Sequence, residues 1–212
     1  MGRKRKATEG AIVKEEKFVN ARGCDDAKRV RNRASPFPVV KLYEFMSKDQ
    51  KDEVVKMDFG SLLDIKCHTL NYFLIKWFAG RYEKHSHEFI IPGQGRIPLN
   101  RDSVYRTLGL PRGSDPVVYD LDAKIEARLA PVLFPEDGSA PSRTRVFEIL
   151  KEMKLADVGF KQIWLMFVVS TILAPTTSIF VSSRCYPVMV SISSPSHVFI
   201  LYCSILTLFL FL

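Results

Sequence analysis

The residues whose types and spacing come nearest to a chemical site form the segment HSHE, from His85 to Glu88. Alternate histidines on an extended segment point the same way, and a carboxylate follows them, as in some zinc sites. The other histidines, His68 and His197, supply no third and fourth ligand at a recognisable spacing. We therefore interpret His85 and His87 as loop residues and predict that the chain has no metal site.

Two further short segments resemble parts of catalytic sites. Cys67 and His68 are adjacent, whereas a nucleophile and its base usually come together through the fold from distant positions. We interpret Cys67 as a buried cysteine beside a polar turn. The segment PGQGR, residues 92–96, has two glycines but lacks the strand, loop and helix order of a phosphate-binding loop, so it predicts a hairpin turn. The sequence thus predicts no catalytic residue and no cofactor, and we expect a protein that is not an enzyme.

Aromatic side chains gather in one segment, at Tyr72, Phe73, Trp77 and Phe78. Such residues can stack on nucleic-acid bases. Here they recur at helical spacing, which is more typical of a helix that faces the core. We therefore predict that these four aromatic residues are core residues.

Basic residues are concentrated at the start of the chain. Residues 1–33 contain eleven Lys and Arg against five Asp and Glu, so they hold most of the net charge of +8. Two short runs stand out as contacts for nuclear import or for a polyanion such as nucleic acid. They consist of Arg3, Lys4, Arg5 and Lys6, and of Lys28, Arg29, Arg31 and Arg33. A solvated charge run that only aids solubility is the equally weighted alternative.

The cysteines and the first residues indicate a compartment. Cys24, Cys67, Cys185 and Cys203 are isolated, without the spacing of a zinc knuckle or a disulfide framework. Reduced thiols in the cytosol or nucleus are then expected. The basic start is not followed by an apolar stretch, so no secretory signal is predicted.

Caps, breaker residues and apolar periodicity indicate a mainly α-helical chain with one short β-hairpin. Pro36 and Pro38 favour an extended entry into the folded part. Helices are expected at 48–57, capped by Ser47 and Gln50; at 69–79, stopped by Gly80; at 101–108, capped by Asn100; at 123–129; at 143–156, capped by Ser142; and at 160–174. The last is apolar nearly all round, which predicts a central buried helix. The hairpin pairs residues 88–91 with residues 96–99.

The end of the chain is atypical, because residues 198–212 contain no charged side chain. A helix of this length spans about 22 Å, short of the roughly 30 Å hydrocarbon core of a membrane. Val190-Ser191 is the dipeptide that a splice-donor sequence would encode if it were translated in frame. The residues after it are rich in Ser, Phe and Leu, as the translation of a T-rich intron would be. We favour a retained intron or an imperfect gene model from about residue 190, with a tail anchor in a membrane as the alternative.

Three segments in order resemble a known family. They are FGSLLDIKCHTLNYFLIKWFAGRY, GRIPLNRDSVYRTLGLPRG and FKQIWLMFVVSTILAPTTSIFVSS. The matching features are Phe59-Gly60 with Leu62 and Leu63, Ile97-Pro98 with Val104, Gly109-Leu110-Pro111, and residues 173–177. Together they resemble the plant mobile domain, also called aminotransferase-like, of transposon-derived plant proteins. The resemblance covers roughly residues 36–186.

This resemblance implies a helical, non-enzymatic module tied to mobile elements and, in some members, to nuclear silencing. The aminotransferase name finds no support, because no lysine has the surroundings that pyridoxal phosphate needs. Some longer relatives carry a SUMO-protease-like domain, whose catalytic residues match no position here. A chain that stopped short of the family's full domain would leave an apolar face exposed.

We therefore expect a disordered basic tail at residues 1–35, one helical domain at 36–186 and an atypical apolar tail at 187–212. The expected function is a nuclear module that binds protein or nucleic acid, the tail supplying nonspecific phosphate contacts. The alternatives are a membrane protein anchored through 198–212 and a fragment of a longer protein with a protease domain. Sequence alone does not identify the binding partner.

Overall fold

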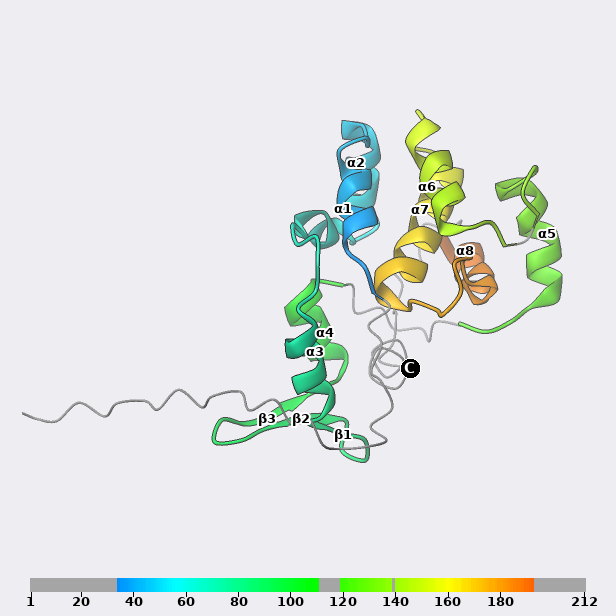
Figure 1. The fold of residues 1–212 in the computed structure, drawn as a ribbon. Coiled ribbons are helices and arrows are strands. Elements are labelled where there is room, and N and C mark those ends of the chain that lie inside the picture. Colours follow the sequence, from blue (N-terminus) through cyan, green and yellow to red (C-terminus); the bar gives the residue numbers. More distant parts are fainter. Residues whose placement is uncertain (1–33, 111–118, 139, 193–212) are drawn as a thin grey trace, which may run out of the picture.

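The computed structural model describes residues 34–110, 119–138 and 140–192, and this part of the chain is mainly helical (Figure 1). Its α-helices are α1 (Phe37–Tyr43), α2 (Lys48–Lys56), α3 (Tyr72–Ala79), α4 (Arg101–Leu108), α5 (Ala123–Leu133), α6 (Arg143–Glu152), α7 (Val158–Val168) and α8 (Tyr186–Ile192). The strands are β1 (Tyr82–Glu83), β2 (Glu88–Ile91) and β3 (Gly95–Pro98). Short 3-10 helices η1 (Gly60–Asp64) and η3 (Ser183–Cys185) and a π-helix η2 (Val169–Leu173) complete the order. The predicted fold class is confirmed.

Side-chain caps fix several helix starts at the predicted residues. Ser47 Oγ accepts from the Gln50 amide at 3.2 Å while Gln50 Oε1 accepts from the Ser47 amide at 2.9 Å, which is the expected capping box. Asn100 Oδ1 accepts from the Ser103 amide at 2.9 Å and so begins α4. Ser142 caps α6 in the same way, through the Arg145 amide. Each cap satisfies an amide that has no partner inside its helix.

The expected extended entry at Pro36 and Pro38 is wrong, because α1 begins there. Pro36 has helical angles at the N-cap and Pro38 lies in the first turn. Proline is tolerated at these positions, since the first amides of a helix have no intrahelical acceptor. The two prolines therefore start a helix.

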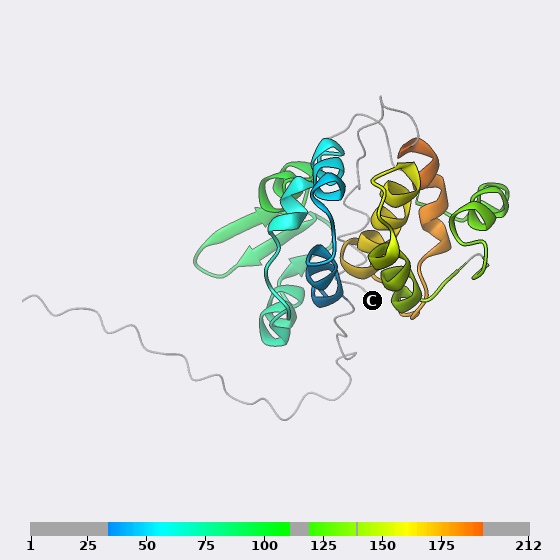
Figure 2. The same cartoon turned by 90° about the horizontal axis from the view of Figure 1, so that it is seen from above.

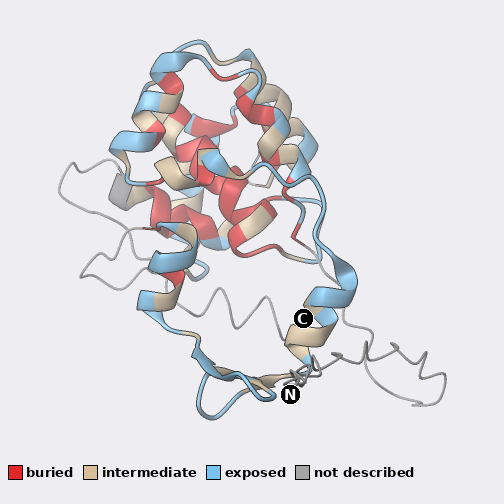
Figure 3. Ribbon diagram, turned by 90° about the vertical axis from the view of Figure 1, so that its left-hand side faces the viewer, coloured by how far each residue is buried: buried red, intermediate tan, exposed pale blue. Residues whose placement is uncertain are grey.

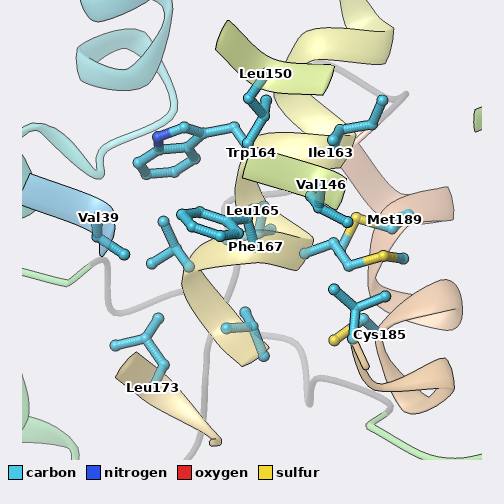
Figure 4. Close-up of a cluster of buried hydrophobic side chains, with 14 of the residues drawn as sticks. Val39, Val146, Leu150, Ile163, Trp164, Leu165, Phe167, Leu173, Cys185 and Met189 are labelled. Atoms are coloured by element: carbon cyan, nitrogen blue, oxygen red, sulfur yellow. The ribbon is translucent and has the colours of Figure 1, made fainter. Parts of the chain in front are cut away.

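The core surrounds α7 (Figure 4). Every residue from Gln162 to Val168 is buried. Trp164 and Phe167 reach toward α1 and α2, and Trp164 meets Phe59 edge-on with ring centroids 6.0 Å apart. Met189 and Cys185 cover the other side of α7 from the α8 segment (Figure 4). The predicted central buried helix is confirmed, although its last turns widen into η2, where the Ala174 amide donates to Val169 O at 2.7 Å.

The packed part of the chain is slightly longer than the expected 36–186. Ala34 is buried, and the Ser35 amide donates to Thr171 O at 3.2 Å. At the other end α8 runs on to Ile192 and buries Val188 and Met189. These residues contribute to the core because α7 needs cover on the side that α8 occupies.

A three-stranded antiparallel sheet lies apart from the helices around α7, with α3 and α4 to either side of it (Figure 2). The hairpin pairs Phe89 with Ile97 and Ile91 with Gly95, so β3 begins one residue earlier than expected. Strand β1 adds to the free edge of β2 and escaped prediction because it has only two residues. We refer to residues 66–110 as the outer lobe.

We call the helices packed around α7 the helical body. The outer lobe attaches to it at the end of α4. Ser61 Oγ in η1 donates to Leu108 O at 2.5 Å, and Val104 and Leu110 are buried. Gly109 follows α4 with φ of +61°, and a Cβ there would lie 2.6 Å from Ser61 Oγ. Only glycine fits both this left-handed backbone and this close approach.

Replacing Gly109 with alanine should therefore destabilise the protein by about 2 kcal/mol or more, because strain and a steric clash add. Gly93→Ala is the matched control: its φ is +71°, yet nothing lies within 4 Å of the new Cβ. This control should lose only about 1 kcal/mol, from backbone strain alone. Urea unfolding monitored by circular dichroism measures both changes. Equal losses in the two variants would contradict the proposed close contact.

A second prediction concerns the thiols. Cys185 is fully buried, and burial raises its pKa to about 12, whereas Cys67 is exposed. At pH 8 only about one Cys185 in ten thousand would be a thiolate. In a Cys24→Ser, Cys203→Ser background, iodoacetamide should modify Cys67 and leave Cys185 unmodified until denaturant is added, as measured by peptide mass spectrometry. Modification of both thiols at similar rates in the folded protein would be evidence against this core.

Candidate functional site

His85, Ser86 and His87 of the HSHE segment lie in the turn between β1 and β2, not in the extended segment assumed from sequence, and Glu88 begins β2. His87 has φ of +54°, and its Nδ1 lies 2.9 Å from the Tyr82 hydroxyl. Glu88 Oε2 accepts from Arg96 at 3.1 Å, so its carboxylate is already paired. Within the described ranges, no three His, Cys, Asp or Glu side chains gather as metal ligands.

The other two sequence candidates also have local roles. Cys67 is exposed, which corrects the prediction of a buried cysteine. The neighbouring His68 ring packs edge-on against Phe37, with centroids 5.6 Å apart. The PGQGR segment forms the predicted hairpin turn, in which Gly93 and Gly95 have positive φ.

Two tyrosines of the helical body, the buried Tyr43 and the half-buried Tyr119, are placed for structure. The Tyr43 hydroxyl donates to Leu62 O at 3.0 Å, and burial raises its pKa. Tyr119 donates to Ser182 Oγ at 3.0 Å, and burial raises its pKa to about 12. Raised pKa values keep both phenols neutral, and each hydroxyl joins segments that are distant in sequence.

The unusual surface lies on α3. Its apolar stripe was predicted to be core, but no residue of α3 is buried. The exposed fraction is 76% for Phe73, 53% for Leu74, 44% for Tyr72 and 36% for the preceding Leu70. We call these four residues the α3 face. Figure 3 shows the contrast, with buried segments gathered in the helical body and exposed or half-buried segments at α3 and the sheet.

Among the described residues, the last turn of α3 makes aromatic contacts with the segments that follow it. Phe78 meets Phe89 of β2 edge-on with ring centroids 5.3 Å apart. Trp77 is covered by the Arg81 guanidinium, 3.7 Å from the ring centroid, and Arg81 Nη1 donates to Trp77 O at 3.1 Å. The α3 face, in the first turn of the helix and just before it, is exposed in the described part of the chain.

The outer lobe is also the basic part of the folded chain. Residues 66–110 contain seven Lys and Arg against three Asp and Glu, whereas residues 34–65 contain four against six. Sequence analysis assigned the basic character to the N-terminal tail alone, because the outer lobe is not visible as a unit in the sequence. Lys66 and Lys76, which precede and follow the α3 face in sequence, are both exposed.

Several predicted features lie outside the described residues. They are the basic runs at Arg3–Lys6 and Lys28–Arg33 and the apolar end at 198–212. Among the residues that the structure does describe, no helix combines the length and apolar composition needed to cross a membrane.

One sequence signal for the α3 face was present but was interpreted differently. Leu70, Phe73, Leu74, Trp77 and Phe78 share one face of a helix, as a core helix would require. Periodicity shows that such a face exists but not what covers it. The strands that follow are short, which indicates that few residues are available to cover this face of the helix.

A scan against family models matches residues 32–202 to the Domain of unknown function (DUF8566). The matched range crosses the Val190-Ser191 junction, as does the continuous helix α8. No match was found among curated proteins or among solved structures. The resemblance to the plant mobile domain is not tested by this result and stays a prediction. Since the match covers most of the chain, the protein belongs to the family described as Domain of unknown function (DUF8566).

Proposed function

We propose that this protein is a non-enzymatic interaction module that binds an acidic, amphipathic segment of another protein through the α3 face. The observation that carries the proposal is the exposure of four neighbouring apolar side chains, Leu70, Tyr72, Phe73 and Leu74. Contiguous exposed apolar surface marks interaction sites in soluble proteins. Burying a leucine or phenylalanine side chain contributes roughly 1.5–3 kcal/mol, so a partner that covers several of them gains useful affinity.

Other exposed apolar residues occur singly or in smaller groups, such as the adjacent Ile179 and Phe180, which are 66% and 46% exposed. Leu155 is 70% exposed in the connection between α6 and α7, and Val132 is 74% exposed on α5. Each is far in sequence from the α3 face and from the other. Single exposed apolar residues are normal on protein surfaces. What distinguishes the α3 face is its size, since four exposed apolar residues lie within five positions of the sequence.

The charge around the α3 face favours an acidic partner. Lys66 and Lys76, which precede and follow it in sequence, are exposed, and the outer lobe has a positive net charge. Acidic residues flanking an apolar segment would pair with these lysines while the apolar side chains cover Phe73 and Leu74. Helix-in-groove and helix-on-helix recognition use this combination of apolar anchors and complementary charge.

Nucleic acid is the other partner that the sequence suggested. Tyr72 and Phe73 could stack on bases, and the lysines could contact phosphates. Leu70 and Leu74 have no flat face for stacking, yet they make up half of the α3 face. This composition favours protein. Nuclear localisation remains part of the proposal and rests on the basic runs at Arg3–Lys6 and Lys28–Arg33.

The test places a photo-crosslinking amino acid at position 73 of the full chain, and at position 155 as a control of similar exposure. After irradiation in nuclear extract, mass spectrometry identifies what is linked. We expect linked peptides that combine apolar and acidic residues at position 73 but not at position 155. Linked nucleotides, a second copy of this chain, or the same products at both positions would each refute the proposal.

Substitution gives an independent prediction. Phe73→Ser should weaken binding of a crosslinked peptide at least tenfold while changing the free energy of unfolding by less than about 0.5 kcal/mol, since Phe73 is a surface residue. The matched variant Leu155→Ser should leave binding unchanged. Fluorescence anisotropy with the synthetic peptide measures affinity, and urea unfolding measures stability. Unchanged affinity in Phe73→Ser would exclude the α3 face as the binding surface.

A further inference from the structure

A second feature, separate from the α3 face, lies in the helical body. A cavity of about 410 Å³ is lined by residues of α1, α6, α7 and η2. Its volume falls within the roughly 300–1,000 Å³ range of small-molecule sites. The side chains around it divide into a cationic and hydroxyl part and an aromatic part, and each part limits what the cavity can hold.

Arg143 is the principal charged residue of the cavity. It is the first residue of α6, it is half-buried, and its Nη1 donates to Ser170 O in η2 at 3.3 Å. Within the described part of the chain, no carboxylate pairs with this guanidinium. Burial lowers its pKa, which reflects the cost of keeping a cation away from water. A guanidinium has five N–H donors, so an anion could accept several of them.

Thr171 and Thr144 add polar groups to the cavity wall. Thr171 belongs to the π-helix η2, is 2% exposed, and its Oγ1 has no hydrogen-bond partner among the described residues. A buried hydroxyl without a partner is unfavourable unless something else supplies one. Thr144 lies in the first turn of α6, where the helix dipole favours negative charge. Local π-helical turns are frequent at functional sites.

The rest of the wall is aromatic. Phe147 and Phe167 lie with ring centroids 6.2 Å apart, and Phe37 is 47% exposed at the side formed by α1. Lys41 on α1 adds a second cation, with its Nζ 6.0 Å from the Phe37 ring centroid. Glu148 is the one acidic residue of the wall, and its carboxylate lies 3.6 Å from Lys151 Nζ. The cavity thus offers two cations next to apolar ring surface.

We propose that this cavity binds a small aromatic oxyanion, with its charged group between Arg143 and Lys41 and its ring against Phe37 and Phe147. The guanidinium and the lysine supply the charge that a carboxylate or phosphate monoester carries. The phenylalanines supply surface that inorganic anions would not use. A ligand with only one of the two features should bind weakly.

The experiment titrates the full chain with phenyl phosphate, phenol and inorganic phosphate by isothermal calorimetry. We expect saturable one-to-one binding of phenyl phosphate, and binding at least tenfold weaker for the other two. Equal affinity for phenyl phosphate and inorganic phosphate would reduce the feature to a nonspecific anion contact and overturn the proposal. Absence of saturable phenyl phosphate binding would overturn it as well.

Variants test the placement. Arg143→Gln should weaken phenyl phosphate binding at least tenfold, whereas Arg128→Gln, at an exposed position on α5, should have no effect. Arg143→Gln also loses the hydrogen bond to Ser170, so Lys41→Gln serves as a second variant that leaves the backbone contacts intact and should weaken binding severalfold. Unchanged affinity in both cavity variants, or equal loss in Arg128→Gln, would overturn the placement. Loss of binding in Phe73→Ser would instead assign the ligand to the α3 face.

Discussion

The rest of the structure depends on one constraint, which is that α7 is apolar on all sides and must be covered on all sides. Eight of its eleven residues are buried, including Trp164 and Phe167. A single neighbouring helix can cover only one face, so α1, α2, α6 and α8 are needed around it. This explains why the packed chain extends from Ala34 to Met189. Helices far apart in sequence are held together because each covers a different face of α7.

The same constraint explains what is left uncovered. The apolar surface of the body is used to surround α7, and the outer lobe attaches through η1 and the end of α4, where Gly109 allows the backbone to approach Ser61. The lobe therefore supports itself mainly with its own contacts, such as Phe78 on Phe89. Those contacts are enough for the last turn of α3. They do not cover the α3 face, which is exposed in the part of the chain that the structure describes.

Helix caps and the buried helix were predictable from the sequence, because they depend on nearby residues. The positions of elements relative to one another were not. The caps at Ser47, Asn100 and Ser142 depend on residues three positions apart, and the buried helix depends on composition alone. The exposure of Phe73 depends on how far the sheet reaches, which no local pattern encodes. The cavity depends on α1, α6 and η2 meeting, so Arg143 and Thr171 gave no sequence signal as a pair. The α1 error was local, because Pro36 and Pro38 were interpreted as favouring an extended backbone although proline also begins helices.

One contact between the cavity and the outer lobe has an energy that can be estimated. Phe37 lines the cavity and also meets the His68 ring edge-on, in the segment that leads into α3. An aromatic pair of this kind contributes about 0.5–1.5 kcal/mol. The free energy that couples two sites through a shared contact cannot exceed the change in that contact's energy when one site is occupied. Through this contact, filling the cavity would change affinity at the α3 face by about tenfold at most, since about 1.4 kcal/mol corresponds to a factor of ten. If both proposed surfaces bind ligands, this contact alone would couple them only weakly.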